Sequence, residues 1–83
     1  MKYKFNQNYN IMERNAIYTF MHDWNGDTFM AAKEKKVPHD RHLGSYRDNS
    51  HNVAQKFSKR LEDCLDGMRV GDTLTIEVTL KHV

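Results

Sequence analysis

The sequence has one cysteine, one proline and four glycines among its 83 residues. The lone Cys64 has no partner within the chain, so an intrachain disulfide is excluded, and a free thiol is typical of a reducing compartment. No apolar run approaches the roughly 20 residues that cross a bilayer, and the first residues lack the apolar segment of a signal peptide. We therefore expect a cytoplasmic protein without a membrane-spanning segment.

The sequence also lacks a recognisable catalytic or cofactor motif. His39 and His42 are spaced so that they might share a metal ion, but no paired cysteine and no second close histidine pair accompanies them. We expect no metal and no cofactor. Cys64 falls on the apolar side of a predicted helix, where a buried and inert thiol is expected rather than a nucleophile.

The length of the chain limits it to a single domain, residues 1–83, with one small core. A core of this size is only marginally stabilising, and pairing with a second copy would bury more apolar surface. We therefore expect a homodimer. The composition, 39% hydrophobic and 29% charged, is that of a folded protein.

The charged residues are unevenly distributed along the chain. The formal net charge is +2, yet residues 33–60 carry eight lysines and arginines against three acids, a net of +5. Residues 61–83 carry two basic residues against five acids, a net of −3, and residues 1–32 are balanced. A basic middle segment indicates an anionic partner, of which phosphate is the most common kind.

Two elements are clear from periodicity. The apolar residues from Val53 to Met68 lie within an arc of roughly 120° on a helical wheel, which predicts an amphipathic helix over about 50–66. Several N-cap residues precede it, and Gly67 suits a left-handed position after its last turn. Residues 73–81 alternate without a fault and are rich in β-branched residues, which predicts a strand with one buried face.

The N-terminal third predicts a β-hairpin. Asn10 to Glu13 resembles a helix capping box, but the apolar residues of 11–24 spread around the whole wheel, whereas 17–20 suits a strand and Asn25-Gly26 suits a type I′ turn. Pairing about this turn sets Trp24 opposite Asp27, His22 opposite Phe29 and Phe20 opposite Ala31. The face meeting the helix would then hold Tyr18, Phe20, Trp24 and Phe29, and the other would hold Ile17, Met21 and Met30.

The apolar residues from Tyr3 to Ile11 fall on odd-numbered positions, which predicts a strand before the hairpin. Few of residues 37–49 are apolar, which predicts a basic, histidine-containing loop. The predicted order is β-β-β-α-β. The fold class is α+β, a small antiparallel sheet packed with one face on a single amphipathic helix. The final strand is expected at an edge, where it can pair with a second copy across a two-fold axis.

The function that best fits this pattern is a small non-enzymatic regulatory protein that binds RNA or a ribonucleoprotein. The helix has cations in its first half and anions in its second, against the macrodipole preference, and an exposed aromatic residue stacks readily on unpaired bases. We expect RNA rather than DNA as partner. The candidate binding residues are Lys33, Lys35, Lys36, Arg41, His42, Tyr46, Arg47, Lys56, Lys59 and Arg60.

Two other functions stay open. The brevity of the chain and its lack of chemistry are typical of small accessory proteins that phages use against host enzymes or defence systems, a role that the RNA-binding function would fit. One alternative is a protein-binding inhibitor of a host enzyme, acting through the apolar sheet face or the acidic carboxy-terminal half. The other is a metal-independent ribonuclease of toxin type. His42, His51, Arg41, Arg47, Lys36 and Tyr46 include the residue types such chemistry requires, although no family motif accompanies them.

Overall fold

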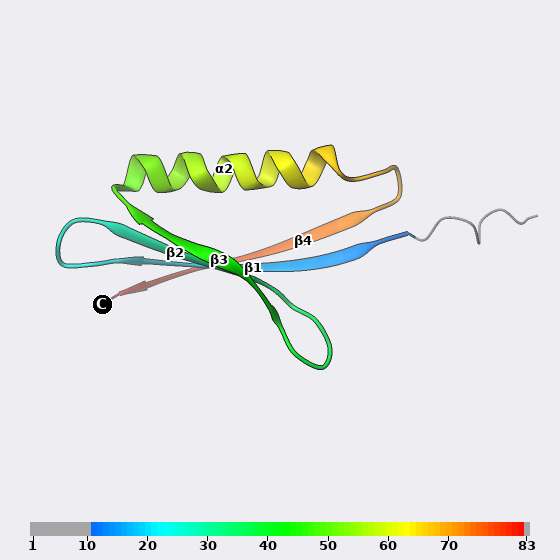
Figure 1. Cartoon of the computed structure of the whole chain (residues 1–83), viewed down its shortest axis with the longest axis horizontal. Helices are drawn as coiled ribbons and strands as arrows, with labels where there is room; N and C mark the ends of the chain where they lie inside the picture. Colours follow the sequence, from blue (N-terminus) through cyan, green and yellow to red (C-terminus); the bar gives the residue numbers. More distant parts are fainter. Residues whose placement is uncertain (1–10, 83) are drawn as a thin grey trace, which may run out of the picture.

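The computed structural model describes residues 11–82 as a twisted sheet with one helix lying along one of its faces (Figure 1). The α+β class and the order β-β-β-α-β are confirmed. The predicted strand before the hairpin lies almost entirely outside the described residues. The elements are β1 (Glu13–His22), β2 (Thr28–Glu34), β3 (Arg41–Asp48), α2 (Ser50–Asp66) and β4 (Thr73–His82).

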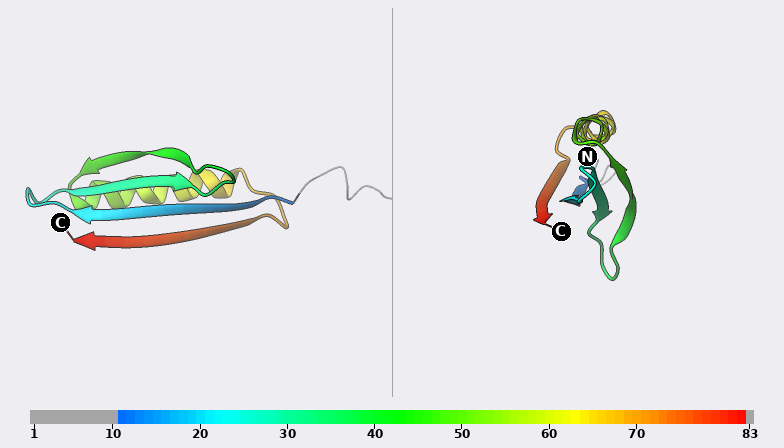
Figure 2. Two further views of the ribbon diagram at one scale, coloured as in Figure 1. Left: turned by 90° about the horizontal axis from the view of Figure 1, so that it is seen from below. Right: turned by 90° about the vertical axis from the view of Figure 1, so that its left-hand side faces the viewer.

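The four strands stand in the order β3-β2-β1-β4, so β3 and β4 form the two edges (Figure 2). β1 pairs antiparallel with β2, and β2 pairs antiparallel with β3, but β4 pairs parallel with β1. The sheet is therefore mixed rather than purely antiparallel. The cause is α2, which carries the chain back to the end where β3 began, so that β4 must run in the same direction as β3 and β1.

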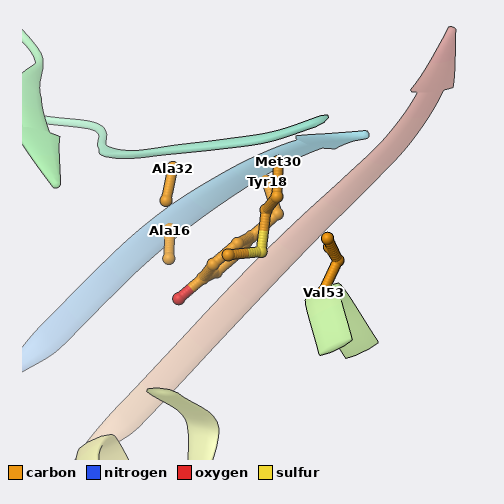
Figure 3. Close-up of a cluster of buried hydrophobic side chains, with 5 residues drawn as sticks. All are labelled: Ala16, Tyr18, Met30, Ala32 and Val53. Atoms are coloured by element: carbon orange, nitrogen blue, oxygen red, sulfur yellow. The ribbon is translucent and has the colours of Figure 1, made fainter. Parts of the chain in front are cut away.

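The core lies between the sheet and α2 and is small. Its buried side chains are Ala16 and Tyr18 of β1, Met30 and Ala32 of β2, and Val53 of α2 (Figure 3). Phe57 of the helix closes this cluster by meeting the Tyr18 ring edge-on, with a centroid distance of 4.8 Å. Even-numbered residues of β1 and β2 thus face the helix, as strand alternation requires.

The hairpin of β1 and β2 exists, but its register differs by one residue from the prediction. Phe20 pairs with Met30 and Met21 with Phe29, because the loop is longer than a two-residue turn. The Asp23 carboxylate accepts hydrogen bonds from the backbone N–H groups of Asn25 and Asp27, which closes this longer loop. Gly26 occupies the left-handed region there, with φ of 87°.

The shift moves every β2 side chain to the other face of the sheet. Met30 becomes the centre of the core with 0% exposure, and Phe29 faces away from the helix. Trp24 is 91% exposed at the tip of the loop, so it does not share the helix-facing side with Tyr18 and Phe20 as predicted.

The predicted loop 37–49 is wrong over most of its length, because residues 41–48 form the edge strand β3. Only Leu43 and Tyr46 of this strand pack partly against the core, which is why its sequence looks like loop. A bulge interrupts the pairing with β2: Ala32 pairs with Gly44 and Lys33 with His42, leaving Leu43 as the extra residue. Gly44 has φ of 123°, a value that favours glycine.

The helix and the final strand are confirmed almost to the residue. α2 begins after Asn49, whose side-chain oxygen accepts the backbone N–H of Asn52 at 2.9 Å. It ends at Gly67, which has φ of −89° and is not in the left-handed conformation predicted for it. α2 lies over β2 and β3, as the view onto the sheet shows (Figure 2, left), while β4 lies farther from it with Leu74 and Ile76 packed partly against the core.

Candidate nucleic-acid interface

Glu34 is a nearly buried carboxylate at the end of β2, and three cations surround it. Arg14 of β1 donates a hydrogen bond from Nε to Glu34 Oε2 at 2.9 Å. Arg41 Nη1 and Lys36 Nζ lie 3.6 and 3.9 Å from Glu34 Oε1. The Glu34 side chain is 6% exposed, whereas the side chains of the three cations are 36–64% exposed. The carboxylate therefore fixes positive groups that remain accessible from outside.

The electrostatics of this cluster leave an excess of positive charge. The hydrogen bond from Arg14, assisted by the charges of Arg14, Lys36 and Arg41, lowers the pKa of Glu34 against the opposing effect of its burial. The same hydrogen bond raises the pKa of Arg14. Three cations against one carboxylate give the cluster a net charge of +2. Glu34 Oε1 is buried and accepts no hydrogen bond from the described residues, so its interactions there are Coulombic alone.

More cations follow along the line where β3 meets α2. Lys56 Nζ lies 5.2 Å from the centroid of the Tyr46 ring, a cation–π arrangement. Arg60 lies across the backbone of Gly44: a Cβ added there would be 3.3 Å from Arg60 Nη2. Arg60, Arg14 and Leu43 line one shallow pocket between β1, β3 and α2. The first turn of α2 has no acidic residue and its last turn no basic one, so this cation placement opposes the helix dipole.

We call this surface the cationic seam. Three acidic side chains adjoin it: Glu34 at one end, Asp63 beside Arg14 and Arg60 in the shallow pocket, and Asp48, which accepts the Tyr46 hydroxyl at 3.0 Å, at the other end. Five basic side chains against three acids give a net charge of +2. From Arg41 to Tyr46 the seam follows β3 for about 17 Å, at about 3.3 Å per residue. The seam consists of Arg14, Lys36, Arg41, Tyr46, Lys56 and Arg60.

The other candidate residues lie elsewhere or are neutralised. Lys59 Nζ contacts Glu62 at 3.2 Å and Asp63 at 3.3 Å on the helix. Lys33 pairs with Asp40 at 3.1 Å and lines a different pocket together with His42 and Ile17, on the face away from α2. Lys35 is exposed just beyond the end of β2. The single patch expected from the sequence is thus divided between the two faces of the sheet.

Arg47 is held at the opposite end of β3 by the hairpin loop. Its Nε atom lies 2.9 Å from Asp23 Oδ2 and 3.4 Å from Asp27 Oδ2. Two carboxylates against one guanidinium leave no excess positive charge at this position.

Sequence reasoning missed Arg14 and Glu34, the two residues that organise the seam. The signal is their place in the alternation: Arg14 precedes the buried Ala16 and Tyr18 by an even step, and Glu34 follows the buried Met30 and Ala32 by an even step. A charged residue on the core-facing side of each of two paired strands, with opposite signs, indicates a cross-strand ion pair.

The face of the sheet away from α2 carries apolar side chains. Ile17 and Met21 of β1, with Phe29 and Ala31 of β2, are half-buried there, and no helix of residues 11–82 covers them. This is the second face expected for the hairpin, with Phe29 in place of Met30.

The two histidines considered for ribonuclease chemistry do not converge. His42 lies on the face away from α2, whereas His51 lines a hollow on the outer side of α2 with Gln55 and Ser58. Within residues 11–82, no group of three or more His, Cys, Asp or Glu side chains is arranged to hold a metal ion. No helix in that range has both the length and the apolar character needed to cross a membrane.

Comparison of the chain with protein-family models, with curated proteins and with solved structures gives no match.

Proposed function

We propose that the protein is a small non-enzymatic regulatory protein that binds RNA, alone or within a ribonucleoprotein, through the cationic seam. The observation that carries this proposal is the Glu34 cluster, in which one buried carboxylate holds three accessible cations and leaves a net charge of +2. Groups fixed in this way meet a phosphate with less loss of side-chain entropy than free surface lysines.

Tyr46, at the other end of the seam, adds an aromatic ring to the phosphate-binding cations. RNA-binding surfaces commonly combine cations with an aromatic ring on which an unpaired base stacks. The Tyr46 ring is partly exposed, is held by its hydroxyl to Asp48 and lies beside Lys56. A single strand following β3 would therefore meet phosphate-binding groups at Arg41 and Arg60 and a stacking group at Tyr46.

Salt dependence tests the electrostatic part of this proposal. If about four phosphates are neutralised, the logarithm of affinity falls with the logarithm of salt concentration at a slope near −3 for single-stranded RNA. The measurement is fluorescence anisotropy of a short labelled RNA of mixed sequence, titrated with the protein at several salt concentrations. A slope near zero would show that the seam does not bind phosphates.

A pair of matched double variants tests the location. Arg41→Glu with Arg60→Glu reverses two charges in the seam, and we expect at least about a hundredfold loss of affinity. Lys33→Glu with Arg47→Glu changes the net charge by the same amount at residues that are already neutralised on other surfaces. We expect this control to lose much less. Equal losses in both would mean that the RNA responds to net charge and not to the seam.

A second candidate function is binding to a protein through the uncovered sheet face. The half-buried Ile17, Met21 and Phe29 on that face favour it, because apolar side chains gathered on one surface mark many protein interfaces. Apolar docking is nearly independent of salt and survives nuclease treatment. Capture of one partner after nuclease digestion, lost in Phe29→Asp and kept in Arg41→Glu with Arg60→Glu, would support this function over RNA binding.

A further inference from the structure

The outer edge of β4 presents a row of backbone groups that pair with no strand of residues 11–82. Thr73 N donates to Met12 O at 2.9 Å, which fixes the direction of the ladder between β4 and β1. In a regular parallel ladder, a residue whose N–H points to a neighbouring strand also points its C=O to that strand. Every second residue along the strand does the same, and the residues between them point both groups the other way. Odd-numbered residues of β4 therefore bond to β1. The even-numbered residues from Leu74 to Leu80 direct their backbone groups outwards, where no strand of the described chain pairs with them.

The two edges of the sheet differ in how they are protected. β3 has a bulge and a positive-φ glycine, features that blunt an edge against pairing. β4 has ten residues without glycine, proline or bulge, and α2 lies over β2 and β3 and leaves the outer edge of β4 open (Figure 2). Its side chains Val78 and Leu80 are 55% and 56% exposed although they point to the helix side of the sheet. Such a regular, partly apolar edge is a template for another strand.

We propose that the occupant of this edge is a second copy of the chain, whose β4 pairs antiparallel with the first about a two-fold axis passing through Thr79. In this register Glu77 of each copy lies opposite Lys81 of the other, so two reciprocal ion pairs form. Val78 of each copy lies opposite Leu80 of the other, which covers the exposed apolar pair. Glu77 and Lys81 have no ion pair within residues 11–82, so both are available.

Charge selects this register over its neighbours. A two-fold axis perpendicular to the sheet keeps equivalent faces together, so only pairings between residues of the same parity are possible. A dimer centred on Glu77 would set two like charges directly opposite each other, which is destabilising. A dimer centred on Val78 would pair each charged side chain with a threonine. Only the axis through Thr79 satisfies both charges.

The resulting dimer has one continuous sheet of eight strands, four from each copy, with both helices on the same face. This inference does not depend on RNA binding, since the seam follows β3 and α2 whereas the proposed contact lies at the outer edge of β4, the opposite edge of the sheet.

Cysteine cross-linking tests the register. Thr79 bonds to β1 through its backbone, so two copies of Thr79 would meet at a non-hydrogen-bonded position, about 4.5 Å apart between Cα atoms and within the range of a disulfide. In a Cys64→Ala background, we expect Thr79→Cys to form a covalent dimer on mild oxidation. Thr75→Cys and Glu77→Cys on the same strand should run as monomers on a non-reducing gel. Cross-linking of either control in preference to Thr79→Cys would overturn the register.

Charge exchange tests the dimer without cysteines. Glu77→Lys sets a lysine of each copy opposite Lys81 of the other, so both ion pairs become repulsive, and we expect the dissociation constant from sedimentation equilibrium to rise by on the order of tenfold or more. Glu77→Lys with Lys81→Glu restores both ion pairs and should return the constant to near the original. Glu13→Lys is a matched control with the same change of charge on β1. A chain that is monomeric at all concentrations, or an equal effect of Glu13→Lys, would refute the proposal.

Discussion

Replacing Glu34 by glutamine is the sharpest test of the ion-pair cluster at the end of β2. The change keeps the size of the side chain and removes its charge, leaving Arg14, Lys36 and Arg41 without their common partner. A hydrogen bond to a charged group contributes about 1.5–3 kcal/mol. Because the Arg14 side chain is 36% exposed and glutamine remains a neutral acceptor, we expect a loss of about 1–2 kcal/mol in the free energy of unfolding.

The loss should depend on pH in a defined direction. The pKa of Glu34 is lowered in the folded protein, so the contribution of the cluster is complete above the unfolded pKa of about 4.3 and disappears as pH falls through the folded pKa. Urea unfolding followed by circular dichroism, at one protein concentration and several pH values, measures this. The difference between Glu34→Gln and the original chain should be largest near neutral pH and shrink in acid.

Glu13→Gln is the control, since Glu13 is exposed on β1 without an ion pair among the described residues. We expect it to change stability by less than about 0.5 kcal/mol. A Glu34→Gln variant as stable as the control at neutral pH, or a loss that stays constant into acid, would refute the account of the cluster.

Two further predictions concern the core and the helix. Met30→Ala should lower the free energy of unfolding by about 2–5 kcal/mol because Met30 is fully buried, whereas Phe29→Ala on the opposite face should cost clearly less; the reverse order in urea unfolding would favour the register expected from the Asn25-Gly26 turn. Asn49→Ala removes the N-cap acceptor of Asn52 N and should cost about 1 kcal/mol, while Asn49→Ser should recover most of it, with an unchanged Asn49→Ala arguing against the cap.

The elements that the sequence predicts well are those whose own periodicity sets their structure. α2 has a continuous apolar arc and an N-cap, and β4 alternates strictly, so both can be located without knowing the rest of the fold. The parallel pairing of β4 with β1 cannot be located in this way. It depends on the end of the sheet to which the helix returns the chain, and it joins residues more than 50 positions apart.

The hairpin shows how the length of a loop sets the register of the strands that it joins. Asn25-Gly26 is the usual signal of a two-residue turn, and the sequence offers no obvious reason to prefer another. In the structure the Asp23 carboxylate accepts two backbone N–H groups within a longer loop, and β2 is shifted by one residue. The shift exchanges Phe29 and Met30 between the core and the open face.

β3 and the seam were harder to foresee for a related reason. An edge strand covered by a helix on one side needs few apolar residues, and β3 packs only Leu43 and Tyr46 against the core. Once the segment is a strand instead of a loop, the bulge at Leu43 shifts its alternation, so that Arg47 and His42 lie on one face and Leu43 turns towards the core. Net charge along the sequence therefore predicted a basic segment but not how the fold would divide it.

The proposed dimer determines how far apart its two RNA-binding seams would lie. In a dimer joined through β4, the two β3 strands stand at the far edges, seven strand spacings or about 34 Å apart at about 4.8 Å each. A short RNA would reach one seam only, whereas a longer one would bind both and gain from the second, intramolecular contact. Glu77→Lys should then leave the affinity for short RNA unchanged and weaken the binding of long RNA. Equal effects on both lengths would separate dimerisation from RNA binding and disprove this coupling.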